Sequence, residues 1–326
     1  MRVFQYVLTL LVLLALNFFL PRLMPGDPLA YLEGDPTADA PVLMTEEMRA
    51  ELRAYYGLDK PLAAQFSAYL AGLAQGDLGW SIYFNAPVAC LLWENLRWTL
   101  FLGGTAAALY TVLGIGLGAL AAWRHGTRVD TGLLLALLGV GSWPPFFLGM
   151  LLIIVFSYRL GLFPIGGARS AIGAGLTGWA RVGDLLHHWT LPALTLVLTH
   201  LPGVALLTRN ALVEVLTEDY VRTARSKGLR EFVVFLRHVL PNGLLSILTL
   251  IAMRFGFMLM GTLFVEVTFA YPGMGSLIAQ AGAARDYPLL QGAFLVTSVV
   301  LLASNLCAEA LYTRLDPRVR VAGEVA

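Results

Sequence analysis

The most chemically distinctive part of this 326-residue chain is a short charged segment, residues 217–228, between two long apolar runs. Acidic side chains stand at its start and basic side chains near its end, which is the order that the dipole of a helix favours. Thr217 can cap the first turn with its hydroxyl, and Gly228 stands where a left-handed residue commonly ends a helix. The segment therefore predicts a surface helix of about three turns. Its charged residues are Glu218, Asp219, Arg222, Arg225 and Lys227.

One side of this predicted helix is small and partly apolar. Tyr220, Val221, Ala224 and Gly228 follow helical spacing, so we expect them to share that face. Such a face, held between two membrane crossings, can press on a cytosolic partner and pass movement into the membrane. Alternatively, the segment is a basic cytoplasmic loop that is helical without a partner. The pattern alone leaves both interpretations open.

The chain lacks the residue patterns of the common hydrolytic enzymes. It contains no G-x-x-x-x-G-K-[ST] phosphate loop, no H-E-x-x-H and no G-x-S-x-G. We therefore expect no catalytic residue. We also expect no metal site, because the adjacent His187 and His188 project about 100° apart on a helix and cannot easily share one metal. If a nucleotide powers this protein, another chain must hydrolyse it. A net charge of +1 gives no electrostatic case for binding nucleic acid.

Two charged residues in or beside the apolar runs are candidates for a translocation pathway. Arg254 interrupts one run, where a central arginine costs at least about 2.5–3.5 kcal/mol on insertion scales. We expect it either to pair inside a helix bundle or to attract an anionic group along a pathway. Glu266 lies about 18 Å further along a helix, too far to pair with Arg254. It either faces the pathway or marks the outer end of its helix, and the second interpretation is favoured.

The chain as a whole is far more apolar than a soluble protein, with 58% hydrophobic and 13% charged residues, against about 25% charged in soluble domains. A helix that crosses a bilayer core needs about 20 apolar residues. Because backbone amides in lipid must be bonded internally, six runs of this kind predict an all-α, polytopic membrane protein with six transmembrane helices. The runs are residues 3–21, 98–123, 131–158, 185–208, 238–265 and 287–308.

These runs divide the chain into a first transmembrane helix, an extracytoplasmic subdomain, a membrane core and a cytoplasmic tail. The boundaries are 1–22, 23–95, 96–313 and 314–326, and the core includes a cytoplasmic loop at 210–241. The first helix lacks a small-residue cleavage site, so we expect it to be retained. Basic residues gather in the short loops on the side that holds both termini, which places both termini in the cytoplasm.

The subdomain after the first run has helix signals of its own. Thr45 predicts the start of one helix and Gly57 its end, and a second short helix is expected at 65–73. The chain has only two cysteines, Cys90 and Cys307, too few for a disulfide framework. We expect both to be buried as small hydrophobic residues.

Nine short motifs follow one another along nearly the whole chain. They are PGDP at 25–28, YGLDKPL at 56–62, GDLGWS at 76–81, GLFPIGG at 161–167, DLLHHWTLPALTL at 184–196, DYVRTARSKGL at 219–229 with RHVLPN at 237–242, VEVTFAYPGMG at 265–275, RDYPLLQG at 285–292 and LDPRVR at 315–320. In this order they resemble the inner-membrane permease subunits of the dipeptide/oligopeptide/nickel class of bacterial ABC importers. The resemblance is greatest to the first of the two paired permeases.

The resemblance implies a transport subunit of the bacterial inner membrane that is not itself an enzyme. Its partners would be a second homologous permease, two ATPase subunits that carry the ATP and Mg, an extracytoplasmic solute-binding protein and membrane lipid. The solute would be a peptide, nickel or a metal chelate. The stretch 219–241 resembles the coupling motif whose helix docks in a cleft of the ATPase. The residues implied in ATPase coupling are Tyr220, Val221, Ala224, Arg225, Lys227, Gly228, Leu229 and Pro241.

The main alternative is a self-contained secondary transporter or channel. It would predict inverted repeats and broken helices that carry acids within the membrane. The sequence shows no internal repeat, and Arg254 is the only charge deep in an apolar run. An intramembrane enzyme would need a catalytic constellation within the runs, and none stands out.

Overall fold

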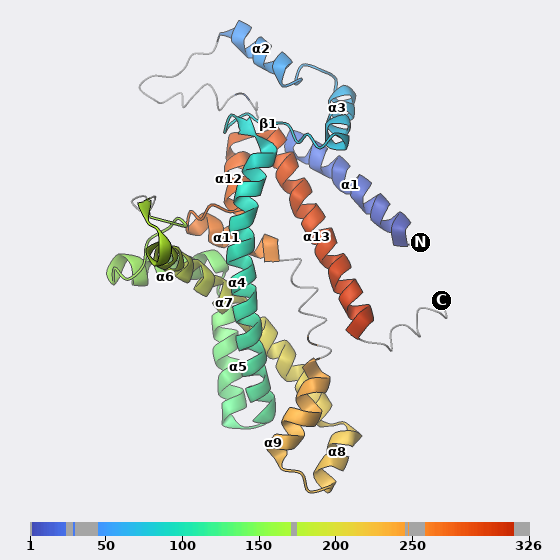
Figure 1. Ribbon diagram of the computed structural model, residues 1–326, viewed down its shortest axis with the longest axis vertical. Helices are drawn as coiled ribbons and strands as arrows, with labels where there is room; N and C mark the ends of the chain where they lie inside the picture. Colours follow the sequence, from blue (N-terminus) through green and yellow to red (C-terminus); the bar gives the residue numbers. More distant parts are fainter. Residues whose placement is uncertain are drawn as a thin grey trace. The chain divides into compact units, whose positions relative to one another are not determined.

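The computed structural model describes residues 2–23, 29, 45–170, 175–244, 247 and 258–315 (Figure 1). These residues are mostly helical, and the only strands among them are β1 (Trp80–Ser81) and β2 (Ala86–Pro87), which pair antiparallel. The predicted all-α class is confirmed at this level. The chain divides into two compact units, Met1–Trp98 with Gly273–Val299 and Thr99–Pro272 with Val300–Ala326. The long helix α4 (Val88–Trp123) contributes residues to both.

The first unit contains the short helices predicted after the first apolar run. Thr45 caps α2 as predicted, because its Oγ1 accepts the backbone N–H of Met48 at 3.3 Å. Gly57, with φ +65°, directly follows the last helical turn, and the helix expected at 65–73 is part of α3. The helices of this unit, besides the start of α4, are α1 (Arg2–Arg22), α2 (Glu46–Tyr55), α3 (Leu62–Ala74), α12 (Met274–Ala284) and the first part of α13 (Tyr287–Leu315).

A buried carboxylate joins two distant motifs in this unit. Asp286 accepts the hydroxyl of Ser81 at 2.5 Å and the backbone N–H of Tyr83 at 3.0 Å through Oδ2. Its Oδ1 accepts the N–H of Leu289 at 3.1 Å, which caps the first turn of α13. Asp286 and Ser81 are both fully buried. The hairpin that holds β1 and β2 is therefore fixed to the turn between α12 and α13.

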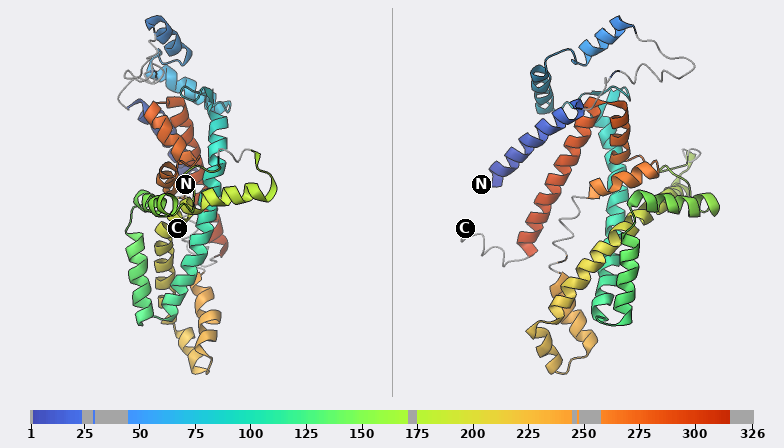
Figure 2. Two further views of the ribbon diagram at one scale, coloured as in Figure 1. Left: turned by 90° about the vertical axis from the view of Figure 1, so that its left-hand side faces the viewer. Right: turned by 180° about the vertical axis from the view of Figure 1, so that it is seen from behind.

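The second unit is built around α7, which packs against α5, α6 and α11. At one end, α8 and α9 follow α7 and lie together (Figures 1 and 2). The elements of this unit, besides the rest of α4 and the end of α13, are α5 (Arg128–Gly141), α6 (Pro145–Leu152), η2 (Ile153–Arg159), α7 (Gly178–Leu216), α8 (Asp219–Ser226), α9 (Glu231–Val234), η4 (Phe235–Val239) and α11 (Met258–Thr268).

The third apolar run does not form the single straight helix that we predicted. It consists of two helical parts, Arg128–Gly141 and Pro145–Arg159, which meet at an angle of 92°. The break falls at Pro144 and Pro145. Proline has no N–H for a helix ladder, and the residue before a proline is disfavoured in the α region, so the helix cannot continue through this pair.

Glycines let α4 and α7 approach closely within the second unit. A Cβ on Gly114 would lie 2.7 Å from Cβ of Val204, and one on Gly118 would lie 2.4 Å from the carbonyl oxygen of Ala205. Real Cβ atoms are not found at such distances from backbone atoms. The backbone spacing of this helix pair therefore depends on the absence of side chains at both positions.

Replacing Gly118 with valine is expected to lower the thermal unfolding midpoint of the detergent-solubilised protein. The added side chain would overlap the backbone of α7, and overpacking of this kind costs at least about 1–3 kcal/mol. Gly116 is the matched control, because it lies on the same helix, is exposed and would have nothing within 4 Å of an added Cβ. Equal losses for the two valine variants would show that the close approach does not limit stability.

Three helices in the described ranges are long and apolar enough to cross a membrane, or up to four with the bent pair. They are Val88–Trp123, Gly178–Leu216 and Tyr287–Leu306, with Arg128–Gly141 plus Pro145–Arg159 as the broken span. The first run lies in α1 (Arg2–Arg22), whose part Leu8–Arg22 is apolar. Much of the fifth run and the tail at 316–326 lie outside the described residues. The structure thus supports a multi-pass membrane protein and does not establish six crossings.

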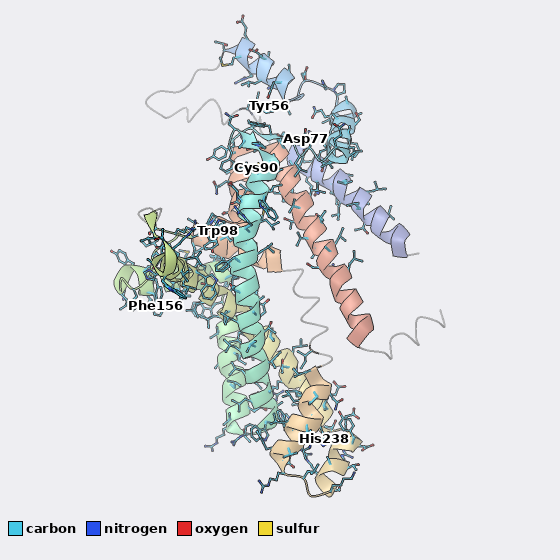
Figure 3. The ribbon with its side chains drawn as sticks, in the orientation of Figure 1. Tyr56, Asp77, Cys90, Trp98, Phe156 and His238 are labelled. Carbon is cyan, nitrogen blue, oxygen red and sulfur yellow. The ribbon has the colours of Figure 1, made fainter. Side chains whose placement is uncertain are left out.

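The expectation that both cysteines are buried is wrong for Cys90. Its side chain is exposed near the start of α4 (Figure 3). This is the surface of a helix with apolar side chains such as Trp93 and Leu100 also exposed. In a membrane protein, lipid or a neighbouring subunit covers such an apolar surface. Cys90 is therefore exposed only because the single chain lacks that covering layer. The side chain of Cys307 lies outside the described residues.

Candidate coupling site

The predicted surface helix is present as α8, with its start one residue later than expected. Thr217 does not cap α8. It ends α7 instead, and its hydroxyl donates to the carbonyl of Glu214 at 2.7 Å. Glu218, which has an extended backbone, occupies the N-cap position. Because Thr217 bonds back into the preceding helix, α8 has 8 residues, or about two turns rather than three.

Gly228 has the left-handed backbone that the sequence predicts, with φ +74°. Its N–H donates to the carbonyl of Arg225 at 2.9 Å and closes the end of the helix. A Cβ placed on Gly228 would meet nothing within 4 Å. The requirement for glycine within this chain is therefore one of backbone conformation, since an L-residue is strained at positive φ.

One side of α8 is buried against the rest of its own chain. Val221 is 0% exposed and Ala224 is 5% exposed. They belong to an apolar cluster that unites the ends of α4 and α7 with α8, α9 and η4. We call this set the anchor cluster: Ala122, Leu212, Val221, Ala224, Val234, Phe235 and Val239. Trp123 extends it by stacking on Phe235, with ring centroids 5.8 Å apart. Val221 and Ala224 therefore fix the helix to the bundle.

The opposite side of α8 and the segment after it are exposed. Tyr220 is exposed, so it does not share a face with Val221 and Ala224 as we predicted; adjacent positions on a helix point about 100° apart. Partial burial raises the pKa of the Tyr220 phenol and the Glu218 carboxylate raises it further, so the phenol stays neutral. The other exposed residues predicted for coupling are Arg225, Lys227, Gly228, Leu229 and Pro241.

Two exposed apolar residues on the next helical segment were not predicted. Phe232 and Leu236 are 52% and 44% exposed, and they lie four positions apart on one side of the helix. Their spacing is visible in the sequence, but the same pattern fits a buried face. An exposed ion pair, with Arg225 Nε 3.0 Å from Glu231 Oε1, connects α8 and α9 across Gly228. Pairs exposed to this degree contribute little stability, so this one mainly orients the turn.

Pro241 shapes the exit from this site. The five residues of η4, Phe235–Val239, form a π-helix, in which the N–H of Leu240 reaches the carbonyl of Phe235. His238, labelled in Figure 3, lies in this widened turn. A proline ring clashes with the carbonyl four residues earlier and has no N–H, so a locally widened helix ahead of Pro241 accommodates it.

Of the two residues predicted to line a translocation pathway, the structure describes only Glu266. Arg254 lies outside the described residues. Glu266 lies in the last turn of α11, which ends at Thr268, as expected for a helix-end residue. Its side chain is fully buried in the second unit and accepts the hydroxyl of Thr99 at 2.7 Å. A role for either residue in a pathway stays a prediction. Among the described residues, no group of three or more metal-ligating side chains is found.

Long apolar helices, one of them broken, with a short helix at one end define the class of this protein as a multi-pass helical membrane protein. The fold is similar to a solved structure of the MetNI methionine ABC transporter in inward-facing conformations, with a TM-score of 0.57 at 13% identity. The match covers 69% of this chain and 96% of that chain.

Sequence comparison identifies the family. Residues 114–321 match the family described as binding-protein-dependent transport system inner membrane component. The chain is 39% identical over 315 residues to a Brucella suis biovar 1 protein that carries the name of a peptide permease, covering 96% of this chain and 95% of that protein. It is 38% identical over 320 residues to a glutathione transport system permease protein of Pectobacterium atrosepticum, covering 98% and 97%.

The chain therefore belongs to the family of binding-protein-dependent inner-membrane permeases, and the resemblance carried by its motifs is confirmed. It is a multi-pass subunit of the inner membrane and a transport component rather than an enzyme. The alternative of a self-contained secondary transporter or channel is not favoured.

Proposed function

We propose that this chain forms one half of the membrane pathway of an ATP-driven importer and that α8 docks in a cleft of a partner ATPase. The observation that carries the proposal is that α8 is buried on one side and exposed on the other. Val221 and Ala224 anchor it to the ends of α4 and α7. Tyr220 and the basic residues Arg225 and Lys227 remain exposed. A helix held in this way moves together with two membrane helices when a partner displaces it.

The proposed assembly contains a second homologous permease, two ATPases that hold ATP and Mg, and an extracytoplasmic solute-binding protein that meets residues 23–95. We propose six crossings, with the first helix at 1–22, the core at 96–313, the coupling loop at 210–241 and both termini in the cytoplasm. Exposed apolar side chains on the membrane helices support such partners. Examples are Val112 on α4 and Phe146 and Met150 on α6, which lipid or a second permease must cover.

The proposed solute is a peptide or a glutathione-like molecule. The support is the pair of relatives named for peptide and glutathione transport. Nickel or a metal chelate, which the shared motifs also allow, is the second choice. Solute choice is expected to rest largely with the binding protein, with Arg254 and Glu266 as candidates for polar contacts along the pathway.

The proposed mechanism is alternating access. ATP binding closes the two ATPases, their movement displaces α8, and the bundle opens outward to receive solute; hydrolysis resets it. ATP binding drives the change only if ATP binds one conformation of the complex more tightly than the other. A ligand that binds both conformations equally does not shift the equilibrium between them.

Uptake is expected only from the complete assembly. Proteoliposomes that contain this chain, the second permease and both ATPases should take up labelled glutathione or dipeptide when ATP and the binding protein are present. Vesicles with this chain alone, or with an ATPase that cannot hydrolyse ATP, should take up none. ATP-independent uptake by this chain alone would support a self-contained transporter instead. Uptake of nickel but of neither glutathione nor dipeptide would favour nickel or a metal chelate as the solute.

A further inference from the structure

A charged cluster beside the anchor cluster has no role in the docking surface. Asp130, at the start of α5, and Arg209, on α7, form a bidentate pair, with Nε–Oδ1 at 2.6 Å and Nη2–Oδ2 at 2.7 Å. The side chain of Asp130 is 3% exposed and that of Arg209 is 15% exposed. Paired, charge-assisted hydrogen bonds of this length are among the strongest and most directional in proteins.

The same carboxylate also holds the loop between α4 and α5. The backbone N–H of Gly126 donates to Asp130 Oδ2 at 3.1 Å, and Nδ1 of His125 lies 3.2 Å from the same oxygen. The hydroxyl of Thr127 accepts the N–H of Asp130 and caps α5. The Asp130 side chain thus joins the α4–α5 loop and the start of α5 to α7, which is distant in sequence.

This pair lies within one turn of the residues that hold α8. Arg209 is three positions before Leu212 on α7, and Leu212 belongs to the anchor cluster with Val221 and Ala224. Helical residues three apart lie on the same side of a helix. α5 contributes no residue to the anchor cluster. The Asp130–Arg209 pair is therefore a direct polar attachment of α5 to the part of α7 that holds α8.

α5 in turn leads to the bent segment. Beyond the 92° break, α6 packs against α7 and α11. Gly149 of α6 would place a Cβ 3.0 Å from the ring of Phe269, at the end of α11. A displacement of the first turn of α5 would move the whole helix up to this break, because packed helices move as units rather than deforming continuously.

We propose that Asp130 and Arg209 form a positioning clamp, through which movement of the coupling helix reaches α5 and α6. The inference rests on the proposed function and deepens it. Neither residue is assigned to contact solute or ATPase. Their role is to make the α5–α6 half follow α7 rather than lag behind it when the ATPases close.

The decisive quantity is the amount of solute imported per ATP hydrolysed by the complete, reconstituted complex. Asp130→Asn keeps the size of the side chain but removes the charge, and Arg209→Lys keeps the charge but loses the bidentate fork. Both complexes should assemble and hydrolyse ATP. The ratio should fall about tenfold or more for Asp130→Asn, the change that the loss of hydrogen bonds to a charged partner produces, and by less for Arg209→Lys. Arg128→Gln, which removes an exposed charge from the same first turn of α5, should leave the ratio unchanged.

A purely structural role predicts a different pattern, in which the variants lose stability and assembly while the surviving complexes keep the wild-type ratio. That result overturns the clamp, as does a wild-type ratio in both variants. If Asp130→Asn does not assemble, Arg209→Lys alone decides. Failure of the proposed function is distinguishable, because the wild-type complex would then show no ATP-dependent import at all.

Discussion

Replacing Gly228 with valine is expected to abolish the solute-stimulated part of ATP hydrolysis in the assembled complex. Gly228 closes α8 at φ +74°, a conformation that costs an L-residue about 1–2 kcal/mol and is least tolerated by β-branched side chains. The chain can relieve this strain by extending or re-closing the end of α8. Either change rotates the exposed residues that follow, including Leu229, relative to the buried Val221 and Ala224. The measurement is ATPase activity of the reconstituted complex with and without loaded binding protein.

Membrane insertion and the amount of purified variant should stay close to those of the wild type. A Cβ at Gly228 meets no atom within 4 Å, so the substitution introduces strain without a clash. Gly161 is the matched control, because it directly follows the C-cap of η2 with φ +61° and has equally open surroundings outside the coupling site and outside residues 23–95. Gly161→Val should carry the same strain and retain stimulation. Stimulated hydrolysis in Gly228→Val at the wild-type level would contradict the docking role of α8.

The sequence predicts a local feature of this protein well where one residue type is required at that position for one physical reason. The hydroxyl of Thr45 caps α2, and the glycines at 57 and 228 adopt left-handed backbones, because these effects depend on immediate neighbours only. Thr217 shows the limit of this reasoning. A hydroxyl between two helices can cap the second or bond back into the first, and the local sequence does not distinguish these outcomes.

Features that depend on tertiary packing were not predictable in the same way. Helical spacing groups Val221 with Ala224, but which side of α8 faces its own chain depends on Leu212 and Phe235. The 92° bend lies in a run whose hydropathy is continuous, so the two prolines carried the only signal. The pairing of Asp130 with Arg209 joins positions 79 residues apart, and nothing in one sequence connects them.

Several of the motifs that carry the family resemblance contact one another in the folded chain. Ser81 ends the motif GDLGWS, and Asp286 belongs to the motif RDYPLLQG; the two side chains bond directly across 205 positions. Gly167 of GLFPIGG donates its N–H to the carbonyl of Phe269, in the motif VEVTFAYPGMG, at 2.8 Å. These motifs therefore specify contacts between distant segments, which explains why several of them occur together and in order.

Replacing Asp286 with alanine is expected to be the most destabilising single change in the first unit. It would remove the acceptor of three donors, the Ser81 hydroxyl and the N–H groups of Tyr83 and Leu289. Each buried donor left without a partner costs about 1–3 kcal/mol, so a total of about 3 kcal/mol or more is expected. The measurement is the thermal unfolding midpoint of the purified protein in detergent. Asp77→Ala is the control, because Asp77 is exposed and its carboxylate caps only the N–H of Gly79 (Figure 3).

The same variant tests whether the hairpin acts independently of the coupling site. The contacts of Asp286 all lie in the first unit, and the anchor cluster lies entirely in the second. Assembly with the ATPases and basal ATP hydrolysis should therefore survive in complexes that remain folded, while uptake is lost as the hairpin detaches from α12 and α13. Ser81→Ala keeps the N–H groups of Tyr83 and Leu289 bonded to Asp286 and removes the acceptor of only one backbone donor, the N–H of Phe84, so it should show a smaller loss of both stability and uptake. An unfolding midpoint for Asp286→Ala equal to that of Asp77→Ala would show that this buried carboxylate does not hold the unit together.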